Sequence, residues 1–307
     1  MTTIRVHDEV AQARHEGRPV VALESTIFSN LGLPSPHNRE ALIRCLDAVR
    51  GAGAIPAVTA VLDGVARVGL GEDEHERILG AARKMSSREV AVAIGQRWSF
   101  GASTVSGALL LAARVGIDVF ATGGIGGVHR GDEGDVSADL GAIARYPVTT
   151  VCAGAKAFLH LPRTLEHLEM LGVPVLGYRT DEFPAFTVRS SGLALPTRVE
   201  TVDDVAAIVV AARAIGIDGG LVLAVPIPEA AALAPHEVEQ ATSDALREAS
   251  ELGLSGAAVT PFILDRLAGA TGGRTIAPNL ALAEHNASVA AQLAVALSGR
   301  EGAGGDG

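Results

Sequence analysis

The chain has 307 residues and a formal net charge of −10, with 25 Lys and Arg against 35 Asp and Glu. This acidic balance argues against a nucleic-acid polymer as partner, because surfaces that bind one are basic. No stretch of 18 apolar residues lacks a charge or a breaker, and residues 1–18 contain no signal-peptide core, so we expect a cytoplasmic protein without membrane contact. The 48% of apolar residues with only 3% aromatic ones is typical of α/β enzymes.

Strands and helices alternate along the first half. A buried strand is predicted at 20–23, and Pro36 opens a helix that ends near residue 50. The Asp63-Gly64 pair predicts a hairpin between strands at 56–62 and 66–70. An amphipathic helix over 72–83, a strand at 90–94, a helix over 104–115 and a strand at 117–121 follow.

The second half repeats this rhythm. Strands are predicted at 148–152, 173–176 and 220–225, with helices after Pro162 and over 202–215. Three helices over 235–252, 261–268 and 280–297 end the chain. The fold class is therefore α/β: one domain with a largely parallel, mixed sheet flanked by helices on both faces. We expect a catalytic domain over 1–299 and a flexible, glycine-rich tail over 300–307.

A glycine-rich segment, Ala-Thr-Gly-Gly-Ile-Gly-Gly-Val-His-Arg-Gly over 121–131, follows the strand at 117–121. Glycines at a strand end let the backbone approach an anion closely, and His129 and Arg130 add donors and charge. The spacing matches neither the dinucleotide fingerprint nor the P-loop. The segment is interpreted as a phosphate-binding loop, with a tight turn that binds nothing as the alternative.

Two carboxylates stand four residues apart in Asp135-Val-Ser-Ala-Asp139, which runs into a predicted short helix. On a helix this spacing places both on one face, and oxygen ligands suit Mg²⁺ or Mn²⁺. The alternative, which the spacing alone favours, is that Asp135 or Ser137 caps the helix.

Lysine is rare in this chain. Of the 25 basic residues only Lys84 and Lys156 are lysines, and the other 23 are arginine. A GC-rich coding sequence explains such a bias without function, but a buried lysine can lose its proton and attack a carbonyl, which arginine cannot do. Lys156 stands among small and apolar residues just past a strand, where desolvation favours a neutral amine. The alternative is a helix lysine that reaches solvent.

Glu24 and Asn279 also stand at chain positions suited to a site. Glu24 ends the first predicted strand, where apolar surroundings can tune it as a general acid, although a salt-bridge or capping role is the commoner use of such a residue. Asn279 either hydrogen-bonds sugar hydroxyls or caps the last helix.

Together these segments resemble the pseudouridine-5′-phosphate glycosidase family, also called indigoidine synthase A-like. The resemblance covers residues 4–298 and is strongest at 22–27, 121–131, 135–140, 151–156 and 278–280. It implies a reversible reaction that cleaves the C–C glycosidic bond of pseudouridine 5′-phosphate to uracil and ribose 5-phosphate. It also implies a homotrimer with one Mn²⁺ per subunit.

The resemblance assigns a role to each matching position. Lys156 matches the lysine that forms a Schiff base with C1′ of the opened ribose, and Glu24 matches the proton donor that opens the ring. Asp135 matches the metal-binding aspartate. The matching substrate-binding positions are Lys84, Val105, His129, Ser137, Ala138, Asp139 and Asn279, with Lys84 and His129 on the phosphate and Asn279 on the sugar.

The chain departs from the family pattern around Trp98, at Ser35 and in a shorter segment between Arg130 and Asp135. These departures concern the substrate more than the chemistry. They leave open a related C-nucleoside or pigment-pathway enzyme that uses another base. An aldolase-like lyase that acts without a base and a non-catalytic nucleotide sensor also stay open.

Overall fold

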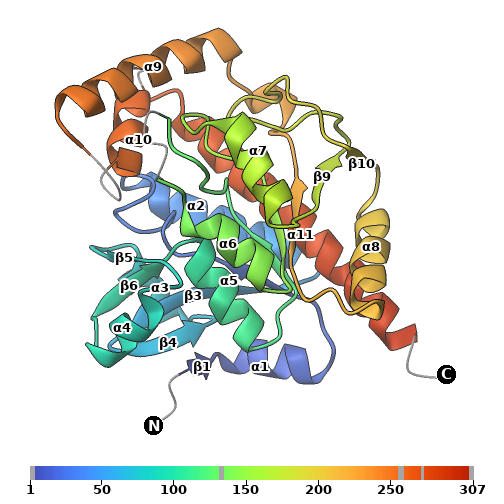
Figure 1. Cartoon of the computed structure of the whole chain (residues 1–307). Helices are drawn as coiled ribbons and strands as arrows, with labels where there is room; N and C mark the ends of the chain where they lie inside the picture. Colours follow the sequence, from blue (N-terminus) through green and yellow to red (C-terminus); the bar gives the residue numbers. More distant parts are fainter. Residues whose placement is uncertain (1–3, 131–134, 255–258, 271–272, 304–307) are drawn as a thin grey trace.

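A single mixed sheet organises the computed structural model, which describes residues 4–130, 135–254, 259–270 and 273–303 (Figure 1). Its main path runs β1-β4-β3-β2-β7-β8-β11-β9-β10, and β6 joins β3 and β5 beside it. Among the described strand pairs, β3 with β4 and β3 with β6 are antiparallel and the others are parallel. The strands are β1 Ile4–Val6, β2 Val20–Leu23, β3 Ile55–Leu62, β4 Val65–Val68, β5 Arg83–Met85, β6 Phe100–Ser103, β7 Val119–Ala121, β8 Thr149–Cys152, β9 Val175–Tyr178, β10 Thr197–Val199 and β11 Leu221–Ala224.

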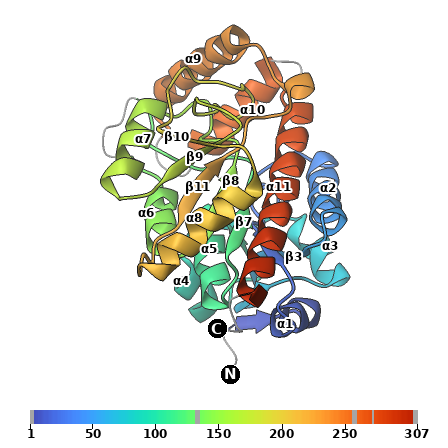
Figure 2. The same cartoon turned by 90° about the vertical axis from the view of Figure 1, so that its right-hand side faces the viewer.

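Helices cover both faces of this sheet, so the predicted α/β architecture is confirmed (Figures 1 and 2). One core cluster packs α1, α4, α5, α6 and α7 on one face, and a second packs α2, α8 and α11 on the other. The helices are α1 Asp8–His15, α2 His37–Gly51, α3 Glu72–Ile78, α4 Val90–Gly95, α5 Val105–Arg114, α6 Ala138–Arg145, α7 Leu161–Met170, α8 Val202–Ala214, the 3₁₀ turn Glu229–Ala231, α9 Pro235–Glu251, α10 Val259–Ala270 and α11 Ile276–Ala303.

The central strands are buried along their whole length. All four residues of β2 and all four of β8 are buried, as expected for parallel strands covered on both faces. The β3–β4 hairpin turns at Asp63 and Gly64, both with positive φ (52° and 75°), which confirms the hairpin predicted from this pair.

Helix α11 is the longest described element and runs along the face of the sheet that is turned to the viewer in Figure 2. It packs on α2, α8 and strands β2, β7 and β8. It is the one described helix long and apolar enough to cross a membrane by length and composition, and 61% of that window is buried within the fold. The helix begins earlier and ends later than the predicted 280–297. It includes residues 300–303 of the predicted tail, and 304–307 lie outside the described residues.

Two predicted elements are wrong. The apolar run at 90–94 forms helix α4, in which Val90 and Ala93 are buried at a helical spacing, and the backbone N–H of Ser86 donates to Glu89 Oε2 (3.0 Å) just before it. The strand of this region is β6 instead. The helix predicted over 72–83 ends at Ile78, because residues from Arg83 pair with β6 as strand β5. This is a long-range pairing that helix periodicity cannot reveal.

Candidate active site

The candidate site lies where three neighbouring parallel strands end. Glu24 directly follows β2, Thr122 directly follows β7, and Lys156 lies four residues beyond β8. Because β2, β7 and β8 are adjacent and parallel, their carboxyl ends meet at one edge of the sheet. The sequence-based expectation that Glu24, the glycine-rich loop and Lys156 follow strands is confirmed.

Glu24 is the buried acid of the site, with 8% of its surface exposed. The Thr122 hydroxyl donates a hydrogen bond to its Oε1. Burial raises the pKa of Glu24 above 4.5, and the nearby Lys156 charge and the Thr122 hydrogen bond only partly oppose this. Glu24 therefore holds its proton more tightly than an ordinary carboxylic acid, as a proton donor requires.

Buried hydroxyl groups fix the chain next to Glu24. The Ser103 hydroxyl donates to the carbonyl of Thr59 (2.7 Å), and the Ser103 backbone N–H donates to the Ser25 hydroxyl (3.0 Å). The Ser25 N–H in turn donates to Ser103 Oγ (3.2 Å). Strands β2, β3 and β6 are thus tied together directly beside the acid.

Lys156 is half-buried, and its backbone N–H donates to the carbonyl of Ile125 (3.2 Å). Gly154, two residues earlier, has a φ of 74°, and a Cβ there would lie 1.9 Å from the carbonyl oxygen of Pro184. Only glycine fits this turn. The small residues around the lysine therefore allow the chain to bend sharply and present it at the sheet edge.

Arg130 stabilises the segment after Lys156. Its guanidinium donates to the carbonyls of Ala157 (3.1 Å) and Leu159 (3.2 Å), and it pairs with Glu239 of α9 (2.9 Å). The Arg130 guanidinium, which the sequence suggested for phosphate binding, thus binds two backbone carbonyls and the Glu239 carboxylate instead.

The glycine-rich loop is shaped by close packing. A Cβ on Gly126 would lie 2.2 Å from Ser137 Oγ, and one on Gly127 would lie 2.3 Å from Thr164 Oγ1. The backbone N–H groups of residues 125, 126, 128 and 129 donate within the protein, to Gly154 O, Asp139 Oδ2, Thr164 Oγ1 and Asp135 O. The tight-turn alternative therefore describes these amides better than a phosphate-binding loop does.

Asp139 joins two helix starts to this loop. Its Oδ1 accepts from the Ser106 N–H in α5 (3.0 Å) and its Oδ2 from the Gly126 N–H (2.9 Å). Ser137 caps α6 by accepting from the Asp139 N–H (3.2 Å), as the capping alternative predicted. Asp135 lies before α6, so the prediction that both carboxylates share a helix face is wrong.

Val105 and Ala138 are the first residues of α5 and α6, and the Asp139 bridge brings these two helix starts together. Helix N-termini attract anions because their N–H groups have no partner within the helix. Lys84, in β5, is exposed. Its pKa is lowered, by partial desolvation first and the Lys156 charge second, while Asp139, Glu24 and Asp135 oppose this. Lys84 therefore lies within electrostatic range of the other four charged groups of the site.

Asp135 and His129 are the polar groups available to a metal. The carboxylate of Asp135 lies 3.9 Å from Nδ1 of His129, and the two side chains are 29% and 15% exposed. In the described part of the chain, no three or more His, Cys, Asp or Glu side chains cluster as metal ligands. One carboxylate open to solvent fits Mn²⁺ or Mg²⁺ only as an ion that keeps most of its water.

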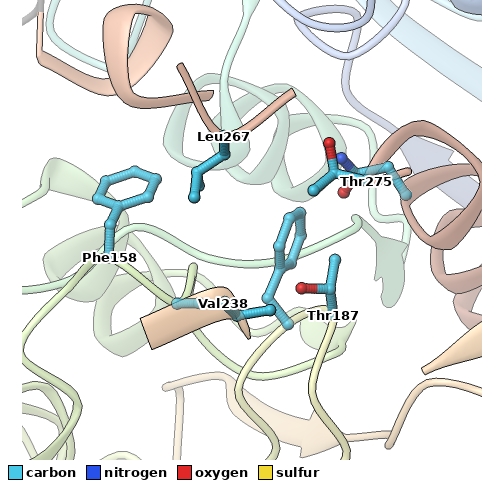
Figure 3. A pocket seen from close by; sticks show the side chains of 8 residues that line it. Phe158, Thr187, Val238, Leu267 and Thr275 are labelled. Carbon is cyan, nitrogen blue, oxygen red and sulfur yellow. The ribbon is translucent and has the colours of Figure 1, made fainter. Parts of the chain in front are cut away.

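A small cavity lies next to Ala157 and Phe158, which directly follow Lys156, on the side of α9 and α10 (Figure 3). Its walls come from five chain segments and are mostly apolar. They comprise Ala157, Phe158, Phe186, Thr187, Val238, Leu267, Thr275 and Asn279. The buried Oδ1 of Asn279 has no hydrogen-bond partner among the described residues. Asn279 thus faces this cavity and not the helix start that the capping alternative assigned to it.

The family whose description is indigoidine synthase A like protein matches residues 9–296. The chain belongs to this family. Pseudouridine-5′-phosphate glycosidase of Herpetosiphon aurantiacus is 50% identical over 97% of this chain and 99% of its own length. The enzyme of that name from Methylobacterium nodulans is 49% identical over 96% and 88%.

Solved structures share the whole fold. The prealnumycin C-glycosynthase in complex with ribulose 5-phosphate aligns with a TM-score of 0.90 and 38% identity over 99% of both chains. An indigoidine synthase A-like protein from Thermotoga maritima aligns with a TM-score of 0.88 and 35% identity over 97% of both. The resemblance drawn from the sequence motifs is confirmed.

Two residues of the site had no role in the sequence-based prediction. Thr122 donates to Glu24, and Asn286 of α11 donates to the carbonyls of Thr122 (2.8 Å) and Gly123 (3.2 Å). Thr122 stands within the glycine-rich segment, so its position at a strand end was the available signal. Asn286 lies 164 residues from Thr122, and no local pattern connects them.

Proposed function

We propose that this protein is a pseudouridine-5′-phosphate glycosidase, which converts pseudouridine 5′-phosphate and water reversibly to uracil and ribose 5-phosphate. One observation carries the proposal: a buried carboxyl group with a raised pKa, Glu24, lies within electrostatic reach of Lys156 at the edge of the sheet. An acid and an amine so placed suit the opening of a sugar ring and the capture of its C1′. The names of the relatives point to the same reaction.

The proposed chemistry begins with ring opening. Lys156 Nζ, as the neutral amine, bonds to C1′ while the bond from C1′ to the ring oxygen breaks, and Glu24 gives that oxygen its proton. The secondary ammonium formed in this way gives up one proton, and C5 of the uracil ring takes one up. The freed nitrogen lone pair then forms an iminium as the C1′–C5 bond breaks and neutral uracil leaves. Water then hydrolyses the iminium and releases ribose 5-phosphate. Asp139 supports this geometry, since both of its oxygens already accept backbone N–H groups.

The phosphate group is proposed to bind where α5 and α6 begin. The N–H groups of Val105 and Ala138 and the Ser137 hydroxyl supply donors there, and Lys84 supplies the positive charge. His129 is a further candidate for binding the phosphate. Such anchoring fixes the sugar over Lys156 and lets remote binding energy assist the reaction.

The base is proposed to occupy the cavity beside Lys156. Aromatic and aliphatic walls suit a flat ring, and Asn279 Oδ1 offers an acceptor that a uracil N–H would satisfy. In this proposal Asn279 contacts the base. The sequence-based prediction had assigned it to the sugar.

Mn²⁺ and the homotrimer stay proposals based on the family resemblance. Asp135 would hold the ion with water and His129 nearby, and the bound ion would add positive charge beside the phosphate. The steps above use only side chains of the protein itself.

A C-glycosynthase that joins a sugar phosphate to another aromatic ring is the second candidate. The likeness to the prealnumycin enzyme favours it, because that protein shares the fold over 99% of both chains. Both candidates predict the same lysine chemistry and differ only in the ring that enters the cavity.

The test is mass spectrometry of the protein mixed with uracil, ribose 5-phosphate and Mn²⁺, with Lys156→Ala as the control. We expect an acid-stable product with the mass of pseudouridine 5′-phosphate, absent with the variant. A borohydride-trapped sugar on Lys156 without this product would favour the second candidate. Neither product nor adduct would contradict both and support a sensor.

A further inference from the structure

Asn286 is a fully buried polar residue behind the site. Its surface is 0% exposed, within the apolar face that α11 packs on the sheet. Burying an amide is costly unless its groups are hydrogen-bonded. The side-chain Nδ2 meets this demand through the carbonyls of Thr122 and Gly123, whereas Oδ1 has no partner among the described residues.

These two carbonyls belong to the residues that follow β7 and lie next to Glu24. Thr122 presents its hydroxyl to Glu24 Oε1. Glu24, Thr122, Gly123 and Ala283 of α11 line one small cavity. The turn of α11 before Asn286 also limits Gly123, because a Cβ there would lie 3.0 Å from Leu282 Cδ1. Helix α11 therefore determines where the chain after β7 can lie.

We infer that Asn286 is a positioning residue: by holding the backbone at Thr122 and Gly123, it aims the Thr122 hydroxyl at the proton donor Glu24. This inference rests on the proposed function for its catalytic meaning. The connection from α11 through Thr122 to Glu24 can be tested without turnover, by titration of Glu24.

The charges that face Glu24 come from several elements. Lys156 and Lys84 favour its ionised form, whereas Asp139 disfavours it. Cys45 of α2 lines the same cavity, and burial raises its pKa to about 12, so it stays neutral. Asn286 itself carries no charge. Its removal therefore acts on Glu24 through the Thr122 hydrogen bond and not through a changed field.

The chain offers a matched control. Asn38 of α2 is also buried, with 4% exposed, and its Nδ2 also donates to two backbone carbonyls, those of Phe28 (3.0 Å) and Leu79 (3.1 Å). Among the described residues, Thr122 donates to the Glu24 carboxyl, whereas Phe28 and Leu79 do not. Asn38→Ala and Asn286→Ala thus remove the same kind of interaction on two sides of the Glu24 cavity, which Phe28 also lines. Only Asn286 holds the residue whose hydroxyl donates to Glu24.

The experiment compares Asn286→Ala, Thr122→Val, the double variant and Asn38→Ala. Glu24 is titrated by carbon-13 NMR of labelled carboxyl groups, assigned with Glu24→Gln, and kcat/KM is measured against pH. Loss of the Thr122 hydrogen bond raises the pKa of Glu24, so we expect its titration and the alkaline limb of kcat/KM to move up by roughly half to one pH unit in Asn286→Ala. We expect kcat to fall about tenfold or more with little change in KM.

Thr122→Val should move the Glu24 titration equally, and the double variant should add nothing further, since both changes break one connection. Asn38→Ala should lower the melting temperature without either effect. If Asn286→Ala does not fold, Asn286→Ser, which keeps one shorter donor, should give an intermediate shift. An unmoved Glu24 titration in the Asn286 variants, or equal shifts with Asn38→Ala, would overturn the inference. Absent turnover in the unaltered protein would count against the proposed function alone, because the titration is still read.

Discussion

Glu24, Thr122 and Asn286 form a buried floor to the site, whereas Lys84, His129 and Asp135 form a rim that water reaches. On the floor, hydrogen bonds within the protein hold each of the three side chains, and burial raises the pKa of Glu24. On the rim, Nδ1 of His129 and the carboxylate of Asp135 are 3.9 Å apart, which is longer than a hydrogen bond. The proposed function therefore assigns proton transfer to the floor, and anion and metal binding to the rim.

Lys156, which stands between the two, should give the largest effect. Arginine keeps the charge but cannot act as a neutral nucleophile, so Lys156→Arg should lower turnover by about 10³-fold or more. Release of uracil from pseudouridine 5′-phosphate is the measurement. Lys84→Arg serves as the matched control, because it is the only other lysine and should keep most of the turnover. Near-normal turnover of Lys156→Arg would mean that charge alone matters at this position, and equal losses in both variants would remove the special role of Lys156.

Glu24→Gln tests the floor. Glutamine is uncharged and has the shape of the acid, but it donates no proton to a ring oxygen. We expect turnover to fall by about 10²- to 10⁴-fold while KM changes little. Turnover within a few-fold of the unaltered protein would remove Glu24 from the reaction.

The same variant predicts a pH effect on stability. The pKa of Glu24 is raised in the folded protein above its ordinary 4.5, so the folded state binds more protons than the unfolded state between these two values. The stabilisation is present below the ordinary pKa and is lost as pH rises through the folded pKa. Glu24→Gln removes this dependence. Urea unfolding from about pH 4 to about pH 9 should show the variant gaining stability relative to the unaltered protein as pH rises. A constant difference would contradict the raised pKa.

Lys84→Met tests the rim and should have a smaller effect. Losing the cation beside the phosphate should lower kcat/KM by about tenfold to a hundredfold, mainly through KM. Pseudouridine without its phosphate is the control substrate, for which the variant and the unaltered protein should differ little. An equal loss with both substrates would place Lys84 elsewhere than on the phosphate.

Asp135→Asn should have the smallest effect under saturating metal. Removing the single carboxylate weakens a site that water otherwise completes, so more Mn²⁺ should be needed for half-maximal activity. A titration of activity against Mn²⁺ reads this shift. An unchanged curve would move the metal site away from Asp135.

The sequence could predict the features that depend on local segments, but not those that depend on long-range packing. Strands such as β2 and β8 are short apolar runs with clear ends, and the residues after them form the site, so Glu24 and Lys156 could be found locally. The run at 90–94 was equally apolar and became helix α4, because such short runs carry no decisive period. Asn286 could not be assigned, since its partners are created only when α11 packs against β7. Gly126 and Gly127 were visible in the sequence, but the reason for them, close contact with Ser137 and Thr164, required the fold.

The most direct test of the central claim is to identify the residue that bonds to the sugar. The protein would be incubated with pseudouridine 5′-phosphate and sodium cyanoborohydride, digested and mapped by mass spectrometry, beside Glu24→Gln and Lys84→Arg. We expect one reduced sugar-phosphate adduct, on Lys156, retained in Lys84→Arg and formed much more slowly in Glu24→Gln. An adduct on Lys84, or uracil release without any adduct, would contradict it.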